Sequence, residues 1–243
     1  EKRADEVVPL ASITKIMTAL TALDLIPQQT VVSINSEALL QEGASGLLPN
    51  EKWNLKDLID FSLIESSNDG IAAVASSAGA LTEGLPQERG FGKRSFIDLM
   101  NERAQEIGLS DMHFLNESGL DIHDETEGGA FGSARDVAKM FSFVLQYKPE
   151  ILEPTVTKEK IFVSLDGVEH RAENTNTILE YLPNLLGSKT GYTDIAGGNL
   201  AVVIDPGINN PFVIVVLGST FNERFSDVVT LSQATLEYLE SIN

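Results

Sequence analysis

The spacing of apolar side chains changes after Pro154, and this change limits the folds that the chain can adopt. Before Pro154, apolar residues recur at helical intervals in five segments, residues 11–25, 54–63, 71–80, 96–107 and 133–145. After it, short runs of strand-forming residues dominate, and one last helical segment covers residues 225–242. This order predicts an α/β protein of the α+β type, in which an antiparallel sheet is flanked by helices beside a helical subdomain.

The second half of the chain carries the clearest strand signals. Residues 160–165 and 168–171 are joined by Asp166-Gly167, a dipeptide typical of a tight hairpin turn. Residues 199–204 and 212–217 predict two further strands. In the first half, we expect residues 64–70 to form a polar break between two helices, and residues 84–92 to form a loop.

The length of 243 residues suits one large domain with a substantial core. We therefore expect a single catalytic domain over residues 1–243, with a helical part at about 11–150, a β-rich part at about 155–243 and no second domain at the C-terminus. No apolar run reaches the roughly 18 residues that a spanning helix needs. We expect no membrane contact from this segment.

Charge and composition exclude several kinds of function. The formal net charge of −19 argues against binding to nucleic acid or to an anionic membrane. An anionic substrate would need a local group of cations. The chain has no Cys, and its three histidines (His113, His123 and His170) lack the spacing of a zinc-protease helix. We predict no metal and no cofactor, and we expect each histidine at the surface or in a loop.

Three short motifs carry reactive groups. Ser12 and Lys15 are three residues apart at the start of a helical segment, so they share one face of its first turn. Ser66-Ser67-Asn68 falls in the polar break between helices, and Lys189-Thr190-Gly191 falls at a predicted strand. Taken singly, these motifs are equally consistent with a helix cap, a polar loop and the entrance of a strand.

Together, and in this order, the motifs form the signature of penicillin-binding proteins and class A β-lactamases. The stretch from Pro9 to Leu20 resembles the nucleophile helix of the D-alanyl-D-alanine carboxypeptidases of peptidase family S11, and Leu186 to Gly197 resembles their third motif. Residues 114–121, 133–138 and 174–176 resemble the landmarks between the motifs. The resemblance covers essentially the whole chain and implies the penicillin-binding-protein fold.

The resemblance implies a serine-type carboxypeptidase that removes the terminal D-alanine from peptidoglycan stem peptides and is inhibited by β-lactams. Ser12 would be the nucleophile, and Lys15 its general base. Burial and the charge of Lys189 would keep Lys15 neutral, while Lys189 itself stays charged. Ser66 would relay a proton to the leaving nitrogen, and Asn68 would bind the substrate's amide.

The resemblance also implies the groups that hold the substrate. Lys189, Thr190 and Arg224 are the candidates for holding its free carboxylate, and they include the cations expected above. Gly191 and Tyr192 complete the predicted substrate-binding residues. The backbone N–H groups of Ser12 and Tyr192 would form the oxyanion hole. Such an enzyme is expected outside the cytoplasm, in the periplasm or cell envelope, with its targeting segment not in this chain.

The sequence departs from the family at its start, where strands of the central sheet are expected before the nucleophile helix. We therefore expect a sheet that lacks partners on one edge. Two other functions stay open. A class A-like β-lactamase is one, although its Glu-x-x-Leu-Asn pattern is not found between Ser66 and Lys189. A non-catalytic module that binds penicillin or peptidoglycan is the other.

Overall fold

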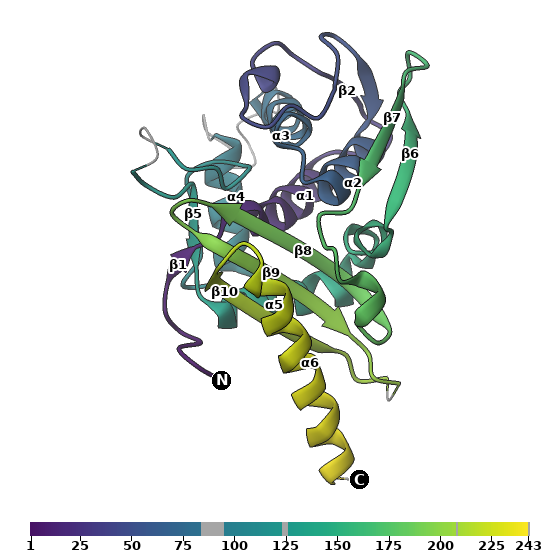
Figure 1. Cartoon of the computed structure of the whole chain (residues 1–243). Coiled ribbons are helices and arrows are strands. Elements are labelled where there is room, and N and C mark those ends of the chain that lie inside the picture. The colour runs from purple at the N-terminus through teal and green to yellow at the C-terminus, as the bar shows by residue number, and fades with distance from the viewer. Residues whose placement is uncertain (84–94, 123–125, 208, 243) are drawn as a thin grey trace.

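The structure is a computed structural model, and it describes residues 1–83, 95–122, 126–207 and 209–242 (Figure 1). The loop expected over residues 84–92 and the side chain of His123 lie outside these ranges. The helices are α1 (Thr14–Leu25), α2 (Leu55–Glu65), α3 (Asn68–Glu83), α4 (Phe96–Glu106), α5 (Ala134–Tyr147) and α6 (Glu223–Ile242). Short 3-10 turns cover η1 (Ala11–Ile13), η2 (Ala38–Leu40), η4 (Pro149–Ile151), η5 (Glu153–Val156) and η6 (Leu179–Tyr181).

The strands of the described residues form four small antiparallel sheets. The largest has the order β10-β9-β8, from Phe212–Ser219, Gly197–Ile204 and Leu185–Thr193. A second joins β1 (Val8–Pro9), β5 (Ala130–Gly132) and β4 (His113–Phe114). The remaining two are the pair β2 (Val31–Ser33) with β3 (Lys52–Asn54), and the hairpin β6 (Glu159–Val163) with β7 (Glu169–Glu173). The predicted hairpin, strands and final helix are confirmed.

Strand β9 lies at the centre of the largest sheet, and its side chains alternate between two cores. Leu200, Val202 and Ile204 pack in a cluster with Val228 of α6. Ala201 and Val203 belong to the main core, which the buried faces of α1 to α5 supply. Helix α6 thus covers one face of the sheet, and the helical part lies on the other (Figure 1). This α+β arrangement is the predicted one.

The polar break between α2 and α3 is shorter than expected. Ser66 ends α2 with a left-handed backbone (φ 62°), and α3 begins at Asn68, so only two residues separate the helices. The reason is that a helix start tolerates polar residues, because their side chains accept hydrogen bonds from its free N–H groups. Asp69 does so, with Oδ1 accepting from the N–H of Gly70 at 2.9 Å.

His170 corrects the expectation that each histidine lies at the surface or in a loop. It stands on β7, where alternate residues face the core, and it is 7% exposed. Its Nε2 lies 2.7 Å from Oε1 of Glu51, beside the rings of Trp53 and Phe61. The buried carboxylate satisfies the imidazole, which is why a histidine can occupy this core position. His113 on β4 is exposed, as expected.

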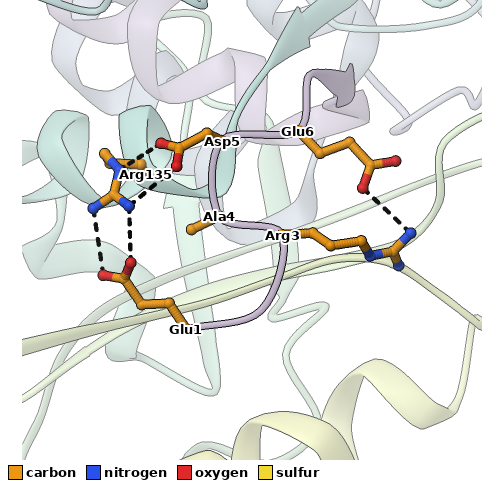
Figure 2. A pocket seen from close by; sticks show the side chains of 6 residues that line it. All are labelled: Glu1, Arg3, Ala4, Asp5, Glu6 and Arg135. Carbon is orange, nitrogen blue, oxygen red and sulfur yellow. Dashed lines mark hydrogen bonds and ion pairs between the residues drawn. The ribbon is translucent and has the colours of Figure 1, made fainter.

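The N-terminal segment is held against α5 by Arg135 (Figure 2). The guanidinium donates to Asp5 at 2.5 Å and to Glu1 at 2.8 Å, and the backbone N–H of Arg135 donates to Ala4. These residues, together with Arg3 and Glu6, line a surface hollow of about 400 Å³. Its ion pairs are exposed, and such pairs contribute little to stability. No motif residue lines this hollow.

No helix of the described residues combines the length and apolar character that crossing a membrane would require.

Candidate active site

Ser12 and Lys15 come together at the junction of η1 and α1. Lys15 Nζ lies 2.7 Å from Ser12 Oγ, as their spacing on one helical turn predicts. Ala11, just before Ser12, has a positive φ of 48°, which is unusual for a residue with a side chain. A backbone of this kind persists only where its surroundings impose it.

Two glycines allow the chain to crowd around this turn. Gly119 has φ +80°, and a Cβ there would lie 2.0 Å from the carbonyl oxygen of Ala11. A Cβ on Gly191 of β8 would lie 2.9 Å from the oxygen of Leu10 and 3.1 Å from the nitrogen of Ser12. The glycine of the third motif is therefore a packing requirement. Without a side chain, β8 can lie directly against the Ser12 turn.

The Lys15 amine is fully buried and is surrounded by oxygen atoms. Its other two oxygen neighbours are Asn68 Oδ1 at 2.6 Å and the backbone oxygen of Ser118 at 3.1 Å, and the amine donates to both. Neither of these two oxygens can donate a hydrogen bond back. A neutral amine has two N–H groups and one lone pair, so these acceptors use its protons. The lone pair then faces the Ser12 hydroxyl.

Burial lowers the pKa of Lys15 from 10.5 to about 7, although the carboxylates of Glu117 and Asp69 act against it. Near neutral pH a large share of Lys15 is therefore uncharged and able to accept a proton. This confirms the expected direction. Burial is the largest cause, and the repulsion between the two lysines appears in the lowered pKa of Lys189.

Ser66 and Lys189 form a second serine–lysine pair. Lys189 Nζ donates to Ser66 Oγ at 2.8 Å and to the backbone oxygen of Thr190 at 3.1 Å. Burial, Lys15 and Arg224 all lower the pKa of Lys189, well below its ordinary value. These neighbours disfavour the charged form of Lys189, and the expectation that it keeps its charge stays a prediction. Two lysines and an arginine this close repel one another's protons in a buried site.

The remaining third-motif residues line up beside Lys189 on β8. Thr190 is buried, and its Oγ1 lies 2.5 Å from Oγ1 of Thr175. Tyr192 is 43% exposed, and its ring meets Phe221 edge to face at 5.0 Å. The N–H of Ser12 belongs to the first turn of a helix, where such groups have no partner within the helix.

Arg224 lies in the first turn of α6 and is brought to the same place. Its Nη1 donates to the backbone oxygen of Gly191 at 2.7 Å, and the side chain is 4% exposed. The guanidinium stacks on Phe221 and Phe225, at 4.6 and 4.7 Å from the ring centres. Burial lowers its pKa. Every residue that the motifs singled out thus lies in one contiguous site.

Asn68 has a second bond that the motif did not predict. While its Oδ1 accepts from Lys15, its Nδ2 donates to the backbone oxygen of Glu42 at 2.8 Å. Asp69 holds the same segment, because its carboxylate accepts from the N–H of Ser45 at 3.1 Å and from its hydroxyl at 2.7 Å. Residues 42–45 are therefore fastened beside the second motif.

Sequence reasoning did not identify three groups that contact the site residues: the carbonyl of Ser118, the carboxylate of Asp69 and the hydroxyl of Thr175. Asp69 directly follows the second motif, so its position was a usable signal. Thr175 lies within the Asn174-Thr175-Asn176 landmark, but its neighbour Thr190 is 15 residues away. The sequence cannot indicate the Ser118 carbonyl, because every residue has a backbone carbonyl.

Comparisons with known proteins point to one family. The family model for D-alanyl-D-alanine carboxypeptidases matches residues 1–220. The carboxypeptidase DacF of Bacillus subtilis is 29% identical over 236 residues, which are 95% of this chain and 56% of DacF. The chain thus spans little more than half the length of this curated relative.

Solved structures show the same fold. A point mutant of the Streptomyces K15 DD-transpeptidase superposes with a TM-score of 0.78 at 25% identity, covering 96% of this chain and 91% of that one. A penicillin-binding protein of Listeria monocytogenes, solved with ampicillin bound, gives a TM-score of 0.72 at 26% identity and covers 96% and 90%. From the family match over residues 1–220, the motif geometry and the shared fold, we conclude that the chain belongs to the D-alanyl-D-alanine carboxypeptidases of peptidase family S11.

Proposed function

We propose that this chain is the catalytic domain of a serine carboxypeptidase that removes the terminal D-alanine from peptidoglycan stem peptides. The observation that carries the proposal is the contact of 2.7 Å between Ser12 Oγ and the buried amine of Lys15, whose pKa is about 7. A serine hydroxyl needs such a base, because it is a weak nucleophile at its own pKa.

In the first step, Ser12 Oγ attacks the carbonyl between the two D-alanines, and Lys15 takes the hydroxyl proton. The backbone N–H groups of Ser12 and Tyr192 stabilise the oxyanion, each contributing about 3 kcal/mol. The C–N bond then breaks as the proton that Lys15 took is relayed through Ser66 to the leaving nitrogen, which returns Lys15 to its neutral form and leaves Ser66 with its own proton. The products of this step are free D-alanine and an ester on Ser12.

In the second step, water attacks the ester and gives one proton to Lys15. The C–O bond to Ser12 breaks, and its oxygen recovers a proton. The shortened peptide leaves as a carboxylic acid. Lys15 is the group suited to both transfers, because the lone pair of its neutral amine faces Ser12.

The terminal carboxylate binds at the other end of the site, where Lys189, Thr190 and Arg224 lie. A carboxylate arriving there raises the pKa of Lys189, because an opposite charge favours the protonated amine. Substrate binding thus favours the charged form of Lys189, which burial in the free protein disfavours. The net charge of −19 disfavours an anionic substrate, and this local group of cationic side chains would provide the attraction that such a substrate needs.

Asn68 would turn its amide to the substrate's backbone after releasing Glu42. β-Lactams present a strained amide beside a carboxylate, so they would acylate Ser12 and leave slowly. The substrate places the protein outside the cytoplasm, in the cell envelope. We propose that residues 1–243 act as one catalytic unit.

The test is labelling with a fluorescent penicillin, followed by mass analysis of the adduct and by D-alanine release from a diacetyl-lysyl-D-alanyl-D-alanine peptide. We expect Ser12→Ala to lose both activities. The exposed Ser33, which also precedes an x-Asn pattern, offers the matched control Ser33→Ala, and this should keep both. Equal labelling of the Ser12→Ala protein would refute the nucleophile. Fast penicillin turnover would indicate a β-lactamase, and binding without D-alanine release would indicate a recognition module.

A further inference from the structure

Thr175 touches the substrate-binding strand without belonging to any of the three motifs. It lies in the turn after β7, and its Oγ1 is 2.5 Å from Oγ1 of Thr190. Thr190 is 3% exposed, whereas Thr175 is half-buried. The two hydroxyls therefore share a short hydrogen bond at the edge of the site, next to Lys189.

The turn that carries Thr175 is firmly held. The side-chain amide of Asn174 donates to the backbone oxygens of Thr155 and Thr157, at 2.8 and 2.9 Å. Its oxygen accepts from the N–H of Asn176 at 2.9 Å. The N–H of Thr175 points at the oxygen of Ile64, two residues before Ser66. The backbone position of Thr175 is thus set by several elements and does not depend on Thr190.

Each hydroxyl has one proton and can donate only one hydrogen bond. If Thr190 donates to Thr175, its proton is used and it offers a carboxylate only lone pairs, which repel it. If Thr175 donates to Thr190, the Thr190 proton is free for the substrate, and one Thr190 lone pair is occupied. Only the second arrangement suits an anionic substrate end.

We propose that Thr175 is a positioning residue that aims the Thr190 hydroxyl proton at the terminal carboxylate of the substrate. The inference rests on the proposed function, because it refines how that site binds its substrate. Since Thr175 occupies a lone pair of Thr190, it also makes Thr190 a poorer acceptor. The pair therefore favours a terminal carboxylate over a terminal amide, whose NH₂ group needs an acceptor.

The test compares Thr175→Ala, which removes the hydroxyl without crowding Thr190, with Thr175→Ser, which restores it. Two substrates are used, diacetyl-lysyl-D-alanyl-D-alanine and the same peptide ending in D-alaninamide. We expect Thr175→Ala to raise KM for the carboxylate peptide about tenfold, the scale of one weakened hydrogen bond to a charged group, with a smaller change in kcat. Its preference for carboxylate over amide should shrink, and Thr175→Ser should restore both values.

Thr177, exposed in the same loop, supplies the matched control, and Thr177→Ala should leave the preference unchanged. A double-mutant cycle gives a second measurement. In a Thr190→Val background, Thr175→Ala should have no further effect on the carboxylate preference, because the hydroxyl that it positions is gone. Additive effects would overturn the proposal, and so would a Thr175→Ala protein that keeps the full preference.

The proposed function and the role of Thr175 can be refuted separately. If the parent and Ser12→Ala proteins release D-alanine equally slowly, the proposed function is wrong. If the parent is active and Ser12→Ala is not, while Thr175→Ala behaves like the parent, only the role of Thr175 is wrong.

Discussion

Two of the buried polar clusters among the described residues differ in how their charges are compensated. In one, Glu51 of the segment before β3 meets His170 of β7 at 2.7 Å. In the other, Lys15 and Lys189 lie among serine, amide and carbonyl oxygens. The first pairs an acid with a base, whereas the second places two bases together.

In the Glu51 cluster, hydrogen bonds compensate the buried negative charge of the carboxylate. Burial raises the pKa of Glu51, but hydrogen bonds from the N–H of Leu48, from His170 and from Ser164 outweigh it and lower the pKa. Trp53 packs on this pair, with its ring centre 5.2 Å from that of His170. The cluster fastens the β6–β7 hairpin to the segment before β3. A compensated pair of this kind holds elements together.

The lysine cluster leaves its charges without an acid partner among the hydrogen bonds that hold them. Uncompensated burial is costly, and it shifts a pKa toward the neutral form. Groups of this kind gather at functional sites more often than in the structural core. The contrast separates a stabilising cluster from a reactive one. It also leads to opposite predictions for mutations.

The largest effect is expected from Lys15→Met, which removes the base but keeps the length of the side chain. Acylation by penicillin should slow about 1,000-fold, within the range found for general bases. The free energy of unfolding should stay equal or rise, because a buried amine is replaced by an apolar group. Stopped-flow labelling and urea denaturation measure the two quantities. Lys52→Met, at an exposed lysine of β3, is the control that should change neither.

Glu51→Ala should show the reverse pattern. Removing one partner of a buried pair leaves the other uncompensated, and we expect a loss of about 3–5 kcal/mol in the free energy of unfolding. The acylation rate of the folded protein should stay close to that of the parent. The exposed Glu37 provides the control Glu37→Ala. A large drop in acylation by folded Glu51→Ala protein would show that the clusters are coupled.

The smallest change is expected from pH, which titrates both clusters without mutation. Lys15 must be neutral to act, so acylation should rise about tenfold per pH unit below a pKa of about 7 and then level off. The Lys15→Met protein should lack this limb. An acylation rate that is flat from acid to neutral pH would contradict the role of Lys15.

Stability should follow the same pKa shifts. Because the folded pKa of Lys15 is lowered, the unfolded chain binds more protons between about 7 and 10.5, and Lys15's contribution to stability rises with pH in this window. The lowered pKa of Glu51 gives a contribution that is lost as the solution becomes acidic enough to protonate the folded carboxylate. Glu51→Ala should lack the acid part of the profile, and Lys15→Met the alkaline part.

Much of the fold could be predicted because it depends on local signals. Helical spacing indicated α1 to α5, and Asp166-Gly167 indicated the β6–β7 hairpin. His170 was misplaced because its strand neighbours are polar, and only Glu51, 119 residues away, makes its burial acceptable. The break between α2 and α3 was overestimated, because polar residues at a helix start resemble a loop.

The order of three motifs in the sequence marked the candidate reactive groups before any contact was known: Ser12, Lys15, Ser66, Asn68, Lys189 and Thr190. Tertiary structure alone shows how the pKa values of two of them are shifted. Burial lowers the pKa of Lys15 to about 7, and burial together with the charges of Lys15 and Arg224 lowers the pKa of Lys189. Desolvation and Coulomb energy depend on three-dimensional neighbours, whereas a motif records only positions along the chain.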